Sequence, residues 1–131
     1  MSQIMQQLFF SNDVSETLTS VLDGLADDAT KIFILTDEHV RQRVLPLLSG
    51  NPYLERAALI TVRSGDMHKD LDALQSVWTG LQRGNATRQS LLVNIGGGMV
   101  TDMGGFAAAT FKRGICFVNV PTTLLGAVDA A

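Results

Sequence analysis

Short apolar runs that alternate with helical patterns are the feature that most constrains the fold of this chain. Four runs rich in β-branched residues predict strands, at residues 32–35, 57–62, 91–95 and 116–120. None of them alternates strictly between apolar and polar residues, which is typical of strands covered on both faces. An earlier run at residues 7–10 is either an edge strand or one arm of a hairpin.

Helical patterns fill the intervals between these runs. Asn12 or Asp13 could cap a first helix, whose apolar stripe comprises Val14, Leu18, Val21, Leu22 and Leu25. Further helices are predicted over residues 38–48, 69–81 and 99–111, and Gly114 is a natural stop after the last one. Strands and helices that alternate at this spacing indicate parallel strands with right-handed crossovers. We therefore expect a single α/β domain with a Rossmann-like open, mainly parallel sheet and helices on both faces.

Composition excludes several classes of partner. The chain is 46% hydrophobic and 18% charged, as expected of a soluble globular domain. Its net charge of −3 offers no electrostatic reason to expect nucleic acid or an anionic membrane as a partner. Cys116 is the single cysteine, so no internal disulfide can form, which fits a cytoplasmic location. We expect this cysteine to be buried in a strand.

Polar and small residues follow each predicted strand, at the edge where open α/β sheets bind their ligands. Thr36 and Asp37 follow the first run, residues 63–66 the second, Gly96, Gly97 and Gly98 the third, and Pro121, Thr122 and Thr123 the fourth. The glycine turn and the Pro-Thr-Thr turn should therefore converge on one cleft.

The glycine triplet is the sharpest local signal. A strand that runs through three glycines into a helix presents backbone N–H groups and a positive helix end, for which a pyrophosphate is the expected guest. A flexible turn without a ligand explains the triplet about equally well. Asp37 could accept hydrogen bonds from ribose hydroxyls, although a role as helix cap is locally favoured, and Thr122 and Thr123 could donate to a ligand or cap a helix.

Other polar residues indicate no chemistry by themselves. Lys112 and Arg113 are placed in the last turn of the helix predicted over residues 99–111, where positive charge complements the helix dipole. His39 and His68 are isolated and are interpreted as surface residues, so no metal site is predicted in this chain.

Three longer segments, residues 96–102, 105–114 and 120–129, closely resemble the 3-dehydroquinate synthase family in order and spacing. Residues 36–40 and 65–69 resemble two earlier segments of the family. The resemblance implies an N-terminal NAD-binding domain over residues 1–131. It also implies that a helical C-terminal domain, with the ligands of a divalent metal (zinc or cobalt), lies outside this chain.

The resemblance also implies roles for individual residues. Asp37 would hold the adenosine ribose, and Asp66 and Lys69 would lie beside the nucleotide. Gly96, Gly97 and Gly98 with Asp102 would hold the pyrophosphate and the nearby ribose, and Thr122, Thr123 and Leu125 would line the nicotinamide side. Asp129 would reach the carbocyclic substrate, and Arg113 would reach the substrate phosphate across a homodimer interface.

The family converts 3-deoxy-D-arabino-heptulosonate 7-phosphate, a sugar phosphate, to 3-dehydroquinate and phosphate in aromatic biosynthesis. The resemblance thus implies an NAD-dependent carbon–oxygen lyase, of which this chain alone is expected to be inactive. Two residues depart from the family pattern: Thr101 replaces a usual glycine, and Asp66 replaces a glutamate. The alternatives are another sugar-phosphate cyclase, similar to 2-deoxy-scyllo-inosose synthase, a metal-dependent alcohol or glycerol dehydrogenase, and a binding module without chemistry.

Overall fold

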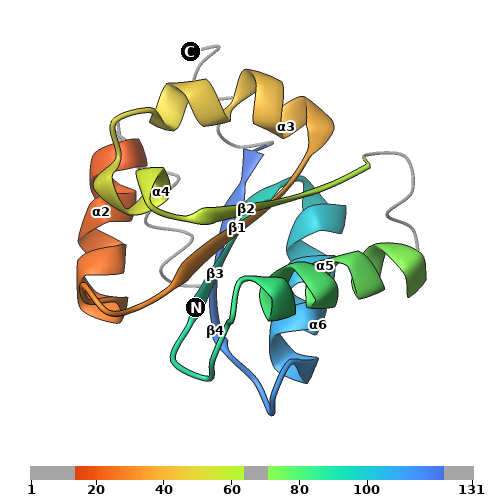
Figure 1. The fold of residues 1–131 in the computed structure, drawn as a ribbon. Helices are drawn as coiled ribbons and strands as arrows, with labels where there is room; N and C mark the ends of the chain where they lie inside the picture. The colour runs from red at the N-terminus through yellow and green to blue at the C-terminus, as the bar shows by residue number, and fades with distance from the viewer. Residues whose placement is uncertain (1–13, 64–70, 123–131) are drawn as a thin grey trace.

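The fold is built around a parallel sheet, as the alternation of runs predicts. The computed structural model describes residues 14–63 and 71–122. Within these residues four strands form one sheet: β1 (Ile32–Asp37), β2 (Ala58–Val62), β3 (Leu91–Gly96) and β4 (Cys116–Pro121). Their order across the sheet is β2-β1-β3-β4, and every described pairing is parallel (Figure 1). The Rossmann-like prediction is confirmed, and the residues 7–10 lie outside the described part of the chain.

Helices cover both faces of the sheet. On one face lie α5 (Leu71–Arg83) and α6 (Gly98–Thr110), and on the other α2 (Val14–Leu25), α3 (Glu38–Arg43), the 3-10 helix η1 (Leu45–Leu48) and α4 (Pro52–Glu55). Because side chains alternate along a strand, Phe33 and Leu35 pack toward α5 and α6, whereas Ile32 and Ile34 pack toward α2 and α3. The sheet therefore has a hydrophobic core on each side.

The helix predicted over residues 38–48 is interrupted. It ends at Arg43, and a 3-10 helix with Pro46 in its first turn follows. Pro46 has no N–H to donate to the carbonyl of Gln42, and its ring would clash with that carbonyl in a continuous α-helix. The prediction of one continuous helix was therefore wrong.

The short helix α4 was not predicted, because four residues are too few to show a helical period. Its N-cap is Asn51, which is 2% exposed. The Oδ1 atom of Asn51 accepts from the N–H groups of Tyr53 (3.1 Å) and Leu54 (3.3 Å). Its Nδ2 donates to the carbonyl of Ser15 (3.1 Å) and to Oγ1 of Thr19 (2.9 Å). One buried amide thus caps α4 and joins it to α2.

Two predictions near the end of α6 were wrong. The helix ends at Thr110, so Lys112 and Arg113 lie in the turn that follows it, with φ angles of 45° and 70°. Gly114 completes this left-handed turn with φ of 105°, so the predicted stop is confirmed. Cys116 lies in β4 as expected, but it is exposed rather than buried. It is the first residue of a strand at the edge of the described sheet, where fewer neighbours cover it.

In the part of the chain that the structure describes, no helix is both long enough and apolar enough to span a bilayer.

Candidate functional site at the carboxyl edge of the sheet

The strand order identifies where a ligand should bind. The connection from β1 leads to β2 on one side of it, whereas β3 pairs on the opposite side. The carboxyl ends of β1 and β3 therefore form a topological switch point, the place where open α/β sheets leave a crevice for ligands. Leu35 pairs with Asn94, so Asp37 and Gly96, each two residues further on, end the two strands at the same level.

The glycine turn and the Pro-Thr-Thr turn lie at this same edge. Gly96 is the register partner of Pro121, so Gly97 and Thr122 directly follow a paired position on adjacent strands. The two turns therefore lie at the carboxyl edge, as predicted, whereas the cleft between them stays a prediction. Thr122 is half-buried and is the first helical residue after β4.

The three glycines of the turn differ in their surroundings. A Cβ added to Gly96 would lie 2.6 Å from Cβ of Val100, so close packing of α6 on β3 explains that glycine. A Cβ added to Gly97 or Gly98 would meet none of the described residues within 4 Å, and Gly97 has an ordinary φ of −75°. Neither packing nor strain in the described residues therefore requires glycine at these two positions.

Among the described residues, the N-terminus of α6 has open space beside it and no side-chain cap. Gly97 is the N-cap of α6 and supplies no side-chain hydrogen bond, and no acidic residue lies in the first turn. The first N–H groups of a helix carry partial positive charge and bind anions when nothing else satisfies them. The backbone here can be approached closely by a phosphate, and a pyrophosphate fits the chemistry of the turn.

Asp37 has the helix-cap role that the sequence favoured, and its second carboxylate oxygen is left for the other. Its Oδ1 accepts from the N–H of Val40 at 2.9 Å and so caps α3. Among the described residues its Oδ2 has no hydrogen-bond partner, and the side chain is only half-buried. One oxygen holds the helix, and the other can accept from a ribose hydroxyl.

The first two turns of α6 carry two further candidates. Asp102 is exposed and lies one helical turn after Gly98, on the same face of the helix. The hydroxyl of Thr101 donates to the carbonyl of Gly98 at 3.1 Å, while its N–H donates to the carbonyl of Gly97 at 3.1 Å. Thr101, which replaces the usual glycine of the family, therefore adds a hydrogen bond within the turn.

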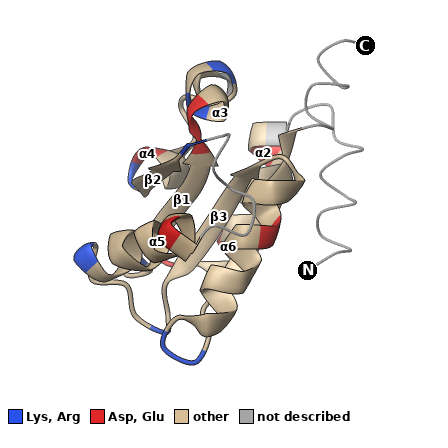
Figure 2. Ribbon diagram, turned by 90° about the vertical axis from the view of Figure 1, so that its right-hand side faces the viewer, with Lys and Arg blue, Asp and Glu red and all other residues tan. Residues whose placement is uncertain are grey.

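Arg113 lies at the other end of the sheet. Because α6 runs from the carboxyl end of β3 back to the amino end of β4, the turn that follows it is remote from Gly97. Basic residues mark this turn in Figure 2. Within one chain, Arg113 cannot join the site formed by Asp37, Gly97 and Thr122.

Several predicted positions lie outside the described residues: Asp66, His68, Lys69, Thr123, Leu125 and Asp129. His39 is exposed, as predicted. Residues 14–63 and 71–122 contain no group of three His, Cys, Asp or Glu side chains that could hold a metal ion.

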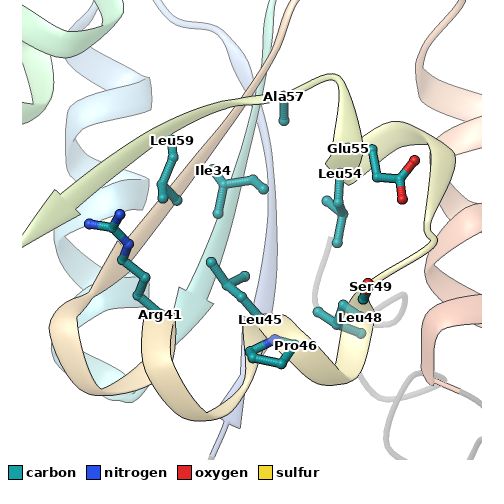
Figure 3. Close-up of a pocket in the computed structure, with 10 residues that line it drawn as sticks. All are labelled: Ile34, Arg41, Leu45, Pro46, Leu48, Ser49, Leu54, Glu55, Ala57 and Leu59. Carbon is teal, nitrogen blue, oxygen red and sulfur yellow. The ribbon is translucent and has the colours of Figure 1, made fainter.

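A hollow of about 450 Å³ lies on the face of the sheet that α3 and α4 cover, away from α5 and α6 (Figure 3). Apolar side chains from β1, β2, η1 and α4 line it, with Arg41 and Glu55 on opposite sides. None of the predicted site residues lines this hollow, and the sequence contains no motif that would have indicated it.

Comparison with known proteins agrees with the fold and the motifs. The family model described as 3-dehydroquinate synthase N-terminal matches residues 59–131. A 3-dehydroquinate synthase from Parabacteroides distasonis is 45% identical over 126 residues, which cover 96% of this chain and 35% of the relative. A bifunctional 3-dehydroquinate synthase/phosphatase from Fusobacterium nucleatum is 30% identical over 128 residues, which cover 97% of this chain and 19% of the relative.

Solved structures share the fold. A 2-deoxy-scyllo-inosose synthase superposes with a TM-score of 0.66 at 24% identity, covering 80% of this chain and 30% of that one. A 2-epi-5-epi-valiolone synthase from Streptomyces hygroscopicus subsp. jinggangensis, with NAD⁺ and Zn²⁺ bound, gives the same TM-score and identity over 85% of this chain and 31% of that one. The chain spans about a third of the length of its Parabacteroides relative. On the family model and the identity to these relatives, the chain belongs to the 3-dehydroquinate synthase family.

Proposed function

We propose that this chain binds NAD at the carboxyl edge of its sheet, as the nucleotide-binding part of a 3-dehydroquinate synthase. The observation that carries the proposal is the open space over Gly97 and Gly98, at an uncapped helix end and beside the switch point between β1 and β3. The 45% identity to a 3-dehydroquinate synthase favours this activity over that of the other sugar-phosphate cyclases, whose 24% identity supports only the fold.

The proposed contacts to the nucleotide come from the carboxyl ends of three strands, β1, β3 and β4. The N–H groups after Gly96, Gly97 and Gly98 hold the pyrophosphate, with Asp102 beside it. Asp37 holds the adenosine ribose through Oδ2, and Thr122 lies toward the nicotinamide. Asp66, Lys69, Thr123 and Leu125 complete the cofactor site, and Asp129 contacts the substrate; these five lie outside the described residues.

The reaction we propose for the parent enzyme is that of an NAD-dependent carbon–oxygen lyase. It turns 3-deoxy-D-arabino-heptulosonate 7-phosphate into 3-dehydroquinate and phosphate. When bound, NAD supplies a hydride acceptor that is regenerated within the same cycle. The role of this chain is to orient the cofactor by its ribose and pyrophosphate, both of which fit the residues at the sheet edge.

A divalent metal, zinc or cobalt, belongs to the proposed activity. A solved 2-deoxy-scyllo-inosose synthase contains NAD⁺ with Co²⁺, and the valiolone synthase contains NAD⁺ with Zn²⁺. The described residues do not fit a metal ion, since they bring no three suitable ligands together. We propose that its ligands lie outside the described residues, in the helical C-terminal domain that the resemblance implies.

Titration calorimetry with NAD tests the cofactor site. We expect weak binding by the 131-residue chain, because the site has a phosphate-binding turn on one side only. ADP, which retains the ribose and the pyrophosphate, should compete for the site, whereas nicotinamide alone should not. Nanomolar affinity would show that this chain completes the site by itself, and the absence of any binding at millimolar NAD would contradict the proposal.

We also propose a homodimer in which Arg113 contacts the substrate phosphate in the site of the partner. Its support is geometric: Arg113 lies at the amino end of the sheet, remote from the glycine turn of its own chain. Light scattering should give the mass of two chains. A monomer at the concentrations used for titration would contradict this for the 131-residue chain.

A further inference from the structure

Two paired asparagines, of which Asn94 is buried and Asn119 half-buried, lie beneath α6, two residues before the candidate ligand-binding turns. Asn94 in β3 and Asn119 in β4 are register partners. Nδ2 of Asn94 donates to Oδ1 of Asn119 at 3.0 Å. Asn94 is 0% exposed, and within the described residues its own Oδ1 has no hydrogen-bond partner. A buried amide oxygen without a partner is costly, and an apolar side chain would fill the same space at less cost.

The unpartnered oxygen lies against α6. A Cβ added to Gly104 would be only 1.9 Å from Oδ1 of Asn94 and 2.1 Å from its Cγ. The missing side chain of Gly104 therefore leaves a gap on the surface of α6, here called the Gly104 notch, and the carboxamide of Asn94 fills this gap. The hydrogen bond to Asn119 fixes the orientation of the Asn94 carboxamide plane, and thus which of its atoms lie against Gly104.

Met99 and Met103 of α6 pack against the core, and Oγ1 of Thr110 at its end accepts from Nε1 of Trp78 at 3.1 Å, but the helix buries mainly small residues against the sheet. Its buried residues are Val100, Gly104, Ala107 and Ala108, of which Val100 alone is a large side chain. Val100 packs against Gly96, and the next contact along the helix is Gly104 on Asn94. Small alanine and glycine contacts resist sliding less than interlocked branched side chains do.

We propose that Asn119 and Asn94 form a positioning pair for the cofactor site. Asn119 holds the Asn94 carboxamide in the Gly104 notch, and this contact sets where the N-terminal turn of α6 lies relative to Asp37 and Thr122. The pyrophosphate is the group whose binding depends on that placement. That the bound group is a pyrophosphate rests on the proposed function, whereas the placement of α6 by the two asparagines does not.

Two variants of the same branched shape separate the hydrogen bond from packing. Asn119→Leu keeps the shape and removes the acceptor, while Asn119→Asp keeps the acceptor. Asn119 is half-buried, so both side chains can be accommodated. If Asn119→Leu does not fold, Asn119→Ala replaces it. Val118→Ala is the stability control, because Val118 is a buried residue of the same strand that packs on the opposite face.

NAD affinity is measured where every variant is fully folded, at high salt to screen the added charge of Asn119→Asp. We expect Asn119→Leu to raise the dissociation constant about tenfold, the change that corresponds to one lost hydrogen bond. Asn119→Asp and Val118→Ala should stay close to the unchanged chain. If Asn119→Leu only lowers stability, as Val118→Ala does, and leaves the affinity unchanged, the pair has no positioning role.

Amide resonances give a second readout that needs no ligand. Asn119→Leu should shift the backbone amide resonances of Gly98 and Met99, and Asn119→Asp should not. If the unchanged chain binds no NAD, the proposed cofactor site fails, and these resonances alone decide the placement of α6. Unshifted Gly98 and Met99 resonances in Asn119→Leu would then overturn the positioning role, and shifted ones would support it.

Discussion

Gly98 illustrates how one residue can favour binding at the expense of stability. An added Cβ meets nothing within 4 Å, so alanine fits the free chain. We expect Gly98→Ala to raise the free energy of unfolding by about 0.5 kcal/mol, because alanine loses less backbone entropy on folding. The same methyl group would occupy the approach to the helix end, so NAD affinity should fall. Urea unfolding and calorimetry on one preparation measure both effects, and an unchanged affinity would argue against close approach of the cofactor.

Gly104, six residues further along the same helix, should respond in the opposite way. Its added Cβ would overlap the Asn94 carboxamide, with 1.9 Å to Oδ1. We expect Gly104→Ala to lower the free energy of unfolding by about 1–3 kcal/mol, the usual cost of overpacking a core. Asn94→Ala in the same chain should restore part of this loss. If the two substitutions are simply additive in a double-mutant cycle, the contact does not hold the helix.

Asp27 connects stability to pH at the turn between α2 and β1. Its Oδ1 accepts from the hydroxyl of Thr30 at 3.0 Å and from the N–H groups of Ala29 and Thr30, both at 2.9 Å. The Thr30 side-chain hydrogen bond and then the Ala29 N–H hold the pKa of this carboxyl below its ordinary value.

Because the folded pKa is lowered, the contribution of Asp27 to stability is complete at neutral pH and is lost as pH falls through the folded pKa. Asp27→Asn should therefore lose less stability than the unchanged chain on acidification below pH about 4. Urea unfolding at neutral and acidic pH measures the difference. An equal loss of stability in both proteins would exclude a role for this carboxyl in the pH dependence.

Among the helices and strands, α4 offers a separable test. Asn51 caps it and donates to Ser15 and Thr19 of α2, and the Tyr53 hydroxyl donates to Asp23 of the same helix. Asn51→Ala removes a cap and several buried bonds, and should lower the free energy of unfolding by about 2 kcal/mol. Asn51→Asp keeps the acceptor and should lose less. NAD affinity should not change in either variant, because α2 and α4 cover the face away from α6. A weaker affinity would mean that the two faces are coupled.

Local patterns predicted most helices and strands because apolar periodicity is a property of neighbouring residues. The four strands appear within two residues of their predicted bounds, and α2, α5 and α6 lie where their stripes placed them. The interruption at Pro46 was visible in the sequence, whereas the four-residue helix after Asn51 was not. Failures therefore concentrate where an element is short or where one residue without an N–H breaks a longer pattern.

The arrangement of the strands could not be predicted in this way, since it depends on pairing between distant residues. The sequence placed Asp37 and Gly96 after strands, but only the order β2-β1-β3-β4 puts them at a switch point. Likewise, nothing in the triplet distinguishes Gly96, which packs on Val100, from Gly97 and Gly98, which face open space. The Asn94–Gly104 contact joins a strand to a helix and is equally invisible along the chain.

At the scale of the molecule, the proposed function makes the described residues one side of a reaction site. The phosphate-binding turn, Asp37 and Thr122 meet at the carboxyl edge, while Arg113 lies at the opposite edge. The matched part of the Parabacteroides relative is 35% of its length, so most of that enzyme has no counterpart among these 131 residues. The groups that would contact the reacting carbons are therefore expected outside the described residues or outside this chain.

From this follows the expectation that the 131-residue chain alone releases no phosphate from 3-deoxy-D-arabino-heptulosonate 7-phosphate. The proposed reaction needs a metal ion close to the oxidised hydroxyl, and a catalytic site of that kind usually takes three protein ligands and one open position. The described residues bring no three such ligands together, and His39 lies exposed on α3 with no second histidine described. Bound NAD would thus have no substrate held against it.

The assay supplies the sugar phosphate, NAD and zinc to the purified chain and follows free phosphate. The chain's Parabacteroides relative serves as the positive control under the same conditions. Adding the separately expressed remainder of that relative to this chain should restore release, because this chain is 45% identical to the part of the relative that it would replace. Release by the chain alone, persisting after repeated purification and abolished by Asp37→Ala, would show that these residues complete a site by themselves, and the two-part organisation would have to be abandoned.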